Sequence, residues 1–121
     1  MRRRNFILAI PVLLAARSSA QAHALLRGAD PAVGSSVPAA PAEVKLLFSE
    51  AVEPAFCRVE VTDAQGGRVD TGQLHVDPNE AKRLVVELAK LGAGTFTVTW
   101  HVTSTDTHKT QGSFTFTVTA P

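Results

Sequence analysis

Apolar and polar residues alternate along the last third of the chain, and a period of two predicts β-strands. In residues 94–103, aromatic residues and valines occupy every second position, with threonines and His101 between them. Residues 111–119 repeat the pattern, with phenylalanine or valine alternating with serine or threonine. β-Branched threonines suit the solvent-facing side of a pleated sheet. These two segments are the clearest predicted strands.

Three earlier segments alternate less regularly and are also predicted to be strands: residues 43–48, 57–62 and 84–88. Proline, glycine, aspartate and asparagine interrupt the chain between them, with turns expected at residues 63–67 and 77–79. Helical periodicity is scarce. Short strands separated by frequent turn signals predict an all-β domain, built as an antiparallel β-sandwich or barrel.

The first 22 residues have the three parts of a secretory signal peptide in the right order. Three arginines at positions 2–4 precede an apolar segment of 11 residues, Phe6–Ala16, and Ala20-Gln21-Ala22 supplies a small-x-small cleavage site. The apolar segment is too short to span a membrane, which takes roughly 20 residues. We expect cleavage between Ala22 and His23, export to the periplasm, and a mature domain of residues 23–121. An amphipathic surface helix or a retained anchor is the alternative interpretation of residues 1–22.

Removal of this segment changes the charge of the chain. Four of the 12 basic residues and none of the 11 acidic residues lie before residue 23, so the mature domain carries a formal charge of −3. It has no basic stretch that could neutralise phosphates, which argues against nucleic acid as a partner. The chain has a single cysteine, Cys57, and therefore cannot form an internal disulfide. At about 99 residues, the mature domain can bury one modest core without such a bond.

The loop between the two clearest strands holds a candidate metal-binding pair. Asp106 and His108 are two residues apart, and in an extended segment such residues point to the same side. The pair alone is a weak signal. An aspartate in a loop more often makes a local turn hydrogen bond, and a nearby histidine is more often a solvated surface residue.

Signal cleavage would make His23 the first residue of the chain, and an N-terminal histidine offers both its α-amine and a ring nitrogen to one ion. Together with Asp106 and His108 it supplies three nitrogens and one oxygen. This donor set matches the tetragonal nitrogen and oxygen environment that Cu(II) prefers. Zinc could use the same ligands in a tetrahedral arrangement, so the ligands alone leave the metal open.

Several short motifs and single residues of the mature sequence are shared with a known family: His23-Ala24-Leu25, Asp30-Pro31-Ala32-Val33-Gly34, Leu47-Phe48-Ser49-Glu50, Trp100, Ser104-x-Asp106-x-His108, Gly112, Phe114 and Val118. Through these residues the mature sequence resembles the CopC/PcoC-type periplasmic copper-binding proteins along nearly its whole length. The family has a Greek-key β-barrel or immunoglobulin-like sandwich, cupredoxin-like in outline, so the resemblance implies that fold, with His23, Asp106 and His108 as Cu(II) ligands.

Two features qualify the site that the resemblance implies. Glu50 falls at the family's acidic position near the copper, where it is interpreted as a supporting residue or weak outer ligand, or equally as a solvated glutamate. Some members of the family also carry a methionine-rich Cu(I) site in the middle of the chain. Residues 63–79 contain no methionine, so the resemblance implies the Cu(II) site alone.

These observations predict a periplasmic copper chaperone or scavenger, acting in copper resistance or homeostasis, that captures Cu(II) and is not an enzyme. The resemblance also implies an inner-membrane copper-transport partner of the CopD type. Two alternatives stay open. One is a copper monooxygenase that uses an N-terminal histidine brace, and the other is an immunoglobulin-like interaction module without metal.

Four further residues are expected to be structural or exposed. His75 lies in a turn-rich region and His101 faces away from Trp100, so both histidines are predicted at the surface. Cys57 shares the parity of the valines in its strand and is predicted to be a small core residue. Trp100 is predicted to be buried, behind the metal loop.

Overall fold

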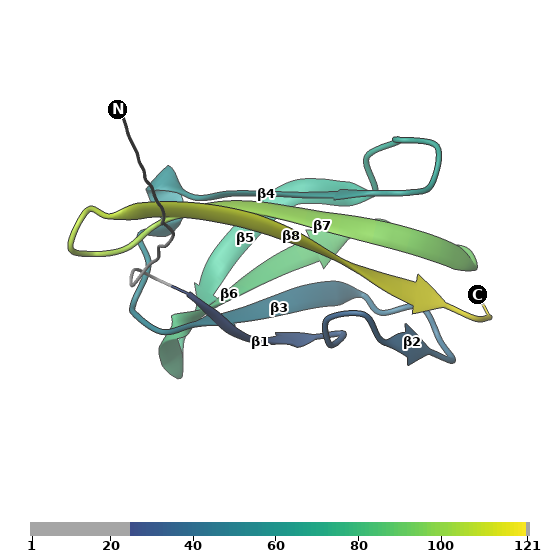
Figure 1. The fold of residues 1–121 in the computed structure, drawn as a ribbon, viewed down its shortest axis with the longest axis horizontal. Coiled ribbons are helices and arrows are strands. Elements are labelled where there is room, and N and C mark those ends of the chain that lie inside the picture. The colour runs from purple at the N-terminus through teal and green to yellow at the C-terminus, as the bar shows by residue number, and fades with distance from the viewer. Residues whose placement is uncertain (1–24, 121) are drawn as a thin grey trace, which may run out of the picture.

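Two β-sheets packed face to face make up the fold (Figure 1). The computed structural model describes residues 25–120 of the chain. One sheet has the strand order β1-β3-β6-β5, and the other has the order β2-β8-β7-β4. The elements of the described region are β1 (Leu26–Asp30), β2 (Ser36–Val37), β3 (Glu43–Phe48), the 3-10 helix η1 (Pro54–Phe56), β4 (Arg58–Thr62), β5 (Asp70–Asp77), β6 (Glu80–Leu88), β7 (Gly94–Thr103) and β8 (Lys109–Val118).

Antiparallel pairing dominates both sheets, as the sequence predicts. The exception is β2, whose two residues pair in parallel with the end of β8. The chain passes repeatedly from one sheet to the other, which is typical of Greek-key sandwiches. The predicted all-β, immunoglobulin-like sandwich is therefore confirmed, whereas the expected signal segment 1–22 lies outside the described residues.

Most predicted strands occur where the alternation places them. Strands β3 and β7 match the predicted ranges, and β4, β6 and β8 overlap theirs with shifted ends. The pattern does not predict β1, β2 or β5. Strand β5 lies at the edge of its sheet, contains Gly72 at a φ of 84° and has an irregular register, so its residues show no regular alternation of burial. His75 belongs to this strand and not to a turn, although it is exposed as predicted.

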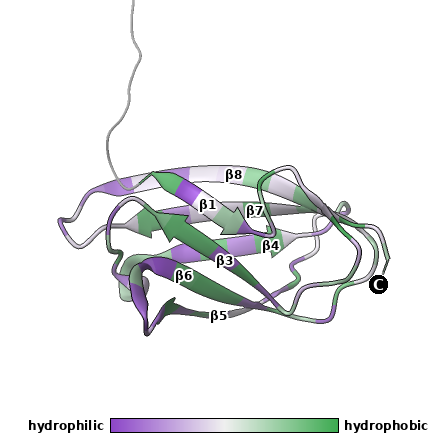
Figure 2. Ribbon diagram, turned by 90° about the horizontal axis from the view of Figure 1, so that it is seen from below, coloured by the Kyte–Doolittle hydropathy of each residue, from purple (hydrophilic) through white to green (hydrophobic). Residues whose placement is uncertain are grey.

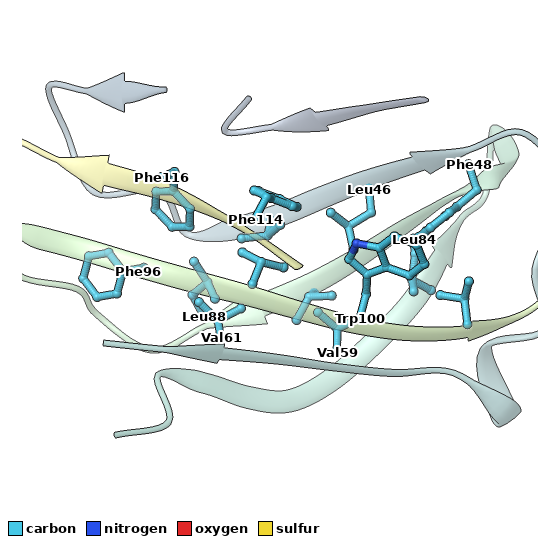
Figure 3. Packing of buried hydrophobic residues seen from close by; sticks show 14 of the residues in the cluster. Leu46, Phe48, Val59, Val61, Leu84, Leu88, Phe96, Trp100, Phe114 and Phe116 are labelled. Carbon is cyan, nitrogen blue, oxygen red and sulfur yellow. The ribbon is translucent and has the colours of Figure 1, made fainter. Parts of the chain in front are cut away.

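The core lies between the sheets and is built from the inward-facing side chains. Figure 2 shows hydrophobic and hydrophilic residues alternating along the strands. Two aromatic pairs occupy opposite ends of the core (Figure 3). Phe48 and Trp100 pack edge-to-face, with ring centroids 5.2 Å apart. Phe96 and Phe116 are stacked, with ring centroids 5.5 Å apart. All four rings are buried, and each such side chain contributes about 1.5–3 kcal/mol to stability.

Trp100 lies directly over a glycine of the neighbouring strand. It pairs in register with Gly112 of β8, and a Cβ atom on Gly112 would lie 2.6 Å from Cζ2 of the indole. The missing side chain of Gly112 therefore makes room for the ring. Burial of Trp100 is confirmed, and its contact with Gly112 joins the two strands that carry the candidate site.

The hairpin of β7 and β8 positions the candidate metal-binding loop. Its strands pair from Gly94 and Val118 at one end to Thr103 and Lys109 at the other, so the loop projects from a long, continuous ribbon. Figure 1 shows this loop, η1 and the start of β1 at the same end of the sandwich, with the C-terminus at the opposite end. Within residues 25–120, no helix is long and apolar enough to cross a membrane.

Candidate metal centre

The loop between β7 and β8 is a tight turn and not the extended segment that the sequence interpretation assumed. The backbone N–H of Thr107 donates to the carbonyl of Ser104 at 2.9 Å, and the N–H of Ser104 donates to the carbonyl of His108 at 2.9 Å. Thr107 has a φ of 74°, in the left-handed region that β-branched residues rarely adopt. The turn thus folds residues 104–108 back on themselves and brings the flanking side chains together.

The structure brings Asp106 and His108 together, as predicted, although by this turn. Nδ1 of His108 lies 3.1 Å from Oδ2 of Asp106, and the two side chains are 60% and 51% exposed. The other carboxylate oxygen of Asp106 accepts hydrogen bonds from the Ser104 hydroxyl and, at 3.3 Å, from the backbone N–H of His108. Ser104 itself is fully buried. An imidazole and a carboxylate therefore lie open to solvent on a buried, hydrogen-bonded support.

These contacts also set the charge of the pair. The Ser104 hydroxyl, followed by the side chain and backbone N–H of His108, lowers the pKa of Asp106 to about 2. Asp106 is consequently a carboxylate throughout the neutral range. Ionised carboxylates and imidazoles are ligands for divalent metals, so the pair presents one oxygen and one nitrogen donor to an incoming ion.

The described chain begins beside this loop. The N–H of Leu25 donates to Oγ of Ser49 at 2.9 Å, and the N–H of Ser49 donates to the carbonyl of Leu25 at 2.8 Å. Two residues further on, the carbonyl of Ala51 accepts the N–H of Thr105 at 3.0 Å. The segment 49–51 therefore connects the start of the described chain to the loop that holds Asp106.

Glu50 lies in the middle of this connecting segment and is half-buried. Among residues 25–120, no three side chains of histidine, cysteine, aspartate or glutamate form a group that could hold a metal ion. The structure thus places Glu50 near the loop in the fold without adding it to the pair of Asp106 and His108. The third predicted ligand, His23, lies outside the described residues.

Two other residues singled out by the sequence lie near the same end. His101 is half-buried, where the sequence predicted a surface residue, and the Arg58 guanidinium donates to its Nδ1 at 3.3 Å. Cys57 is only half-buried and precedes β4, so its prediction as a core residue holds in part. Its thiol donates to the carbonyl of Glu53 at 3.1 Å, and burial raises the pKa of Cys57. A protonated thiol is a poor metal ligand.

The sequence interpretation missed Ser104 as the support of the site. The residue appears only within the Ser-x-Asp-x-His motif, and its role depends on the turn that brings its hydroxyl to Asp106. A buried serine two residues before a loop aspartate is a signal that could have been recognised. Short hydroxyl side chains commonly make local hydrogen bonds of this kind.

Comparisons with known proteins agree with the fold and also show the family of the chain. A family model described as the CopC domain matches residues 26–119. Protein YobA of Escherichia coli (strain K12) is 39% identical over 115 residues, which cover 94% of this chain and 93% of YobA. Copper resistance protein C of Pseudomonas syringae pv. tomato is 32% identical over 124 residues, covering 98% of each chain.

Two solved structures have the same architecture. The crystal structure of CopC from Methylosinus trichosporium OB3b matches with a TM-score of 0.75 and 31% identity, covering 80% of this chain and 94% of that one. PcoC from Escherichia coli, described as a methionine-rich copper resistance protein, matches with a TM-score of 0.71 and 32% identity, covering 80% and 99%. The present chain has a single methionine, Met1. On the family match and these relatives, the chain belongs to the CopC domain family of copper resistance proteins.

Proposed function

We propose that this protein is a periplasmic Cu(II)-binding protein whose mature chain, residues 23–121, begins at His23. In this proposal residues 1–22 are the cleaved signal peptide, and the α-amine and ring of His23 join Asp106 and His108 around one copper ion. The observation that carries the proposal is the pair of Asp106 and His108, 3.1 Å apart and solvent-exposed on the support of Ser104. Membership of the CopC domain family supports copper as the ion.

Chain length allows His23 to reach this pair. His23 is two residues before Leu25, and two residues of extended chain span at most about 7 Å. Leu25 is hydrogen-bonded to Ser49, which is two residues from the carbonyl that accepts Thr105. The N-terminus of a chain cut at Ala22 would therefore start within reach of the loop.

The donor types favour Cu(II) over Cu(I). One amine, two imidazoles and one carboxylate form the nitrogen and oxygen set that Cu(II) prefers, whereas Cu(I) prefers sulfur. Burial raises the pKa of the Cys57 thiol and so favours its protonated form, and the only methionine is Met1, which the proposed cleavage removes. Glu50, in the segment between Leu25 and Thr105, is proposed as a supporting carboxylate.

The proposed activity is capture and release of copper without bond-making chemistry. Two exposed side chains on a surface loop form an open site, which suits transfer of an ion to another protein. We propose an inner-membrane copper-transport protein of the CopD type as the recipient or donor. The names of the relatives, copper resistance protein C among them, support a role in copper resistance or homeostasis.

The decisive experiment moves the N-terminus by one residue. The full precursor and a version with one alanine inserted between Ala22 and His23 would be exported in a bacterial host, and the mass of each product would define its first residue. Cu(II) affinity should fall in the extended protein by at least the roughly 10-fold that loss of a supporting residue costs, because the amine and the ring of His23 no longer belong to one residue. Its electron paramagnetic resonance spectrum should also change.

Two single substitutions complete the test. His108→Ala should remove one nitrogen ligand of copper, which the electron paramagnetic resonance spectrum would report. His75→Ala, on the exposed face of β5, should leave both the spectrum and the Cu(II) affinity unchanged. Equal affinity with and without the inserted alanine would refute the role of the N-terminus. Equal affinity after His108→Ala would refute the site as a whole.

A further inference from the structure

A polar cleft lies beside the metal-binding loop, on the outer face of the sheet that contains β4, β7 and β8. Its volume is about 370 Å³, and its lining includes Phe56, Arg58, His101, Lys109 and Gln111. The strand register explains this grouping. Arg58, His101 and Gln111 are directly opposite one another across three adjacent strands, and Thr103 opposite Lys109 forms the next row. Lys109 immediately follows the candidate ligand His108.

The charge of the cleft is opposite to that of the domain around it. Residues 25–120 contain three more acidic than basic residues, yet no aspartate or glutamate lines the cleft. Arg58 contacts Glu60 at 3.6 Å. Glu60 also contacts Arg68 at 3.7 Å, and Arg68 pairs with Asp70 at 2.7 Å, so the charges of this neighbouring cluster cancel. Within the described residues Lys109 makes no ion pair. The lining of the cleft therefore holds two cations and an imidazole and no carboxylate, and Glu60, the partner of Arg58, lies outside it.

An exposed aromatic residue, Phe56, is part of the lining of the cleft. Phe56 is 70% exposed, an unusual state for a phenylalanine. Its backbone is fixed, because its carbonyl accepts the Thr103 hydroxyl at 3.2 Å and its N–H donates to Glu53 at 2.9 Å. The backbone that carries the exposed ring is thus hydrogen-bonded through both its N–H and its carbonyl. Aromatic residues and arginine together are enriched where protein partners bind.

The cleft continues along the sheet. A second hollow of about 250 Å³ shares His101 and Gln111 with the first and extends to Thr99 and Ser113. From Lys109 to Ser113 the strand covers about 13 Å, the length of four residues of extended chain. The space is suited to a short peptide segment, whereas an inorganic anion would leave most of it, and Phe56, unused.

We propose that this cleft is a docking site for an acidic segment of a partner protein, with a carboxylate of the partner between Arg58 and Lys109 and an apolar side chain against Phe56. A partner held there would lie next to the candidate metal loop. A role for the cleft in copper exchange rests on the proposed function, whereas docking of the partner does not. It can therefore be tested on the metal-free protein, where failure of the copper site has no influence.

The probe is the blocked peptide acetyl-Glu-Ala-Leu-Ala-amide, which places its acidic and apolar side chains on one side when extended, and its Gln-Ala-Leu-Ala counterpart. Each would be titrated into the metal-free, ¹⁵N-labelled protein and followed by amide chemical shifts. The glutamate peptide should produce saturable shifts confined to β4, β7 and β8. The glutamine peptide should bind about tenfold more weakly, as expected for loss of a charged hydrogen bond.

Three variants, each checked for the native spectrum, locate the site. Arg58→Gln and Lys109→Gln should each weaken the glutamate peptide about tenfold, and Lys90→Gln, an exposed cation at the opposite end of the sandwich, should change nothing. Equal binding of both peptides, or an equal loss in Lys90→Gln, would overturn the proposal. So would two other results: inorganic phosphate that shifts the same residues with higher affinity, or shifts that appear on concentrating the protein alone.

Discussion

Replacing Gly112 by alanine tests how the β7–β8 hairpin is packed. The new Cβ would lie 2.6 Å from Cζ2 of Trp100, 2.9 Å from Cε2 and 3.3 Å from Cη2. Ordinary carbon contacts are about 3.5–4.0 Å, so the indole must retreat by about 1 Å. It has little room to do so, because the ring is buried and contacts Phe48 edge-on with centroids 5.2 Å apart.

The expected cost follows from this crowding. Adding a methyl group to a well-packed core costs about 1–3 kcal/mol, a large part of the 5–15 kcal/mol that stabilises a typical domain. For a urea dependence of about 1–3 kcal/mol per molar, the midpoint should fall by about 1 M. Trp100 is the only tryptophan, so its fluorescence reports the transition directly, and circular dichroism gives an independent signal.

A double-mutant cycle identifies the cause of the loss. In a Trp100→Phe background, where the second ring of the indole is absent, Gly112→Ala should cost less than in the native protein, and the difference measures the clash. The matched control is Gly92→Ala, at a glycine whose Cβ would meet nothing within 4 Å. A cost for Gly112→Ala below about 0.5 kcal/mol, or an equal cost in both backgrounds, would refute the packing argument.

Three further predictions concern the loop, a buried carboxylate and the metal. Ser104→Ala should weaken Cu(II) binding in a competition titration, because Asp106 loses the hydroxyl that positions it. Asp70→Asn should lower the free energy of unfolding at pH 7, measured by urea denaturation, by about 1–3 kcal/mol. Burial raises the pKa of Asp70, but hydrogen bonds from Arg68 and from backbone N–H groups outweigh it, so the folded pKa is lowered. The stability from this charge is therefore present above about pH 4 and is lost as pH falls through the lowered folded pKa, so the difference in stability between the variant and native proteins should shrink as the pH is lowered below about 4. Cu(II) should raise the thermal midpoint, and a chelator should reverse the rise.

Much of the fold could be predicted because the buried strands alternate in hydrophobicity. Strands β3 and β7 lie inside their sheets, where every second side chain must enter the core. Their sequences therefore alternate between hydrophobic and more polar residues. The edge strands β1 and β5 have less to bury. Strands β1 and β5 are held in place by hydrogen bonds to β3 and β6. Pairing of this kind between separate segments leaves no local pattern of hydrophobic and polar residues.

The candidate site could be predicted only as a list of residue types. The proximity of Asp106 and His108 followed from their spacing, but the backbone that produces it is a turn with Thr107 at positive φ, which a threonine gives no reason to expect. The Ser104 hydroxyl and the cleft around Arg58 depend on this turn and on register across three strands. The cleft is not encoded within one segment, and the local contact of Ser104 with Asp106 depends on the backbone conformation of the turn.

The two halves of the proposed metal site differ in how they are held. Asp106 and His108 are supported by contacts within residues 104–108 and by the hairpin, so this half forms from local structure. The start of the described chain is placed by the edge strand β1 and by the hydrogen bond of Leu25 to Ser49, 24 residues away. Edge strands separate from a sheet more readily than inner strands, because an edge strand has one hydrogen-bonded neighbour instead of two. An ion bound by both halves would therefore link β1 to the hairpin, and release of copper would require only that the first residues of the chain separate from a loop that keeps its shape.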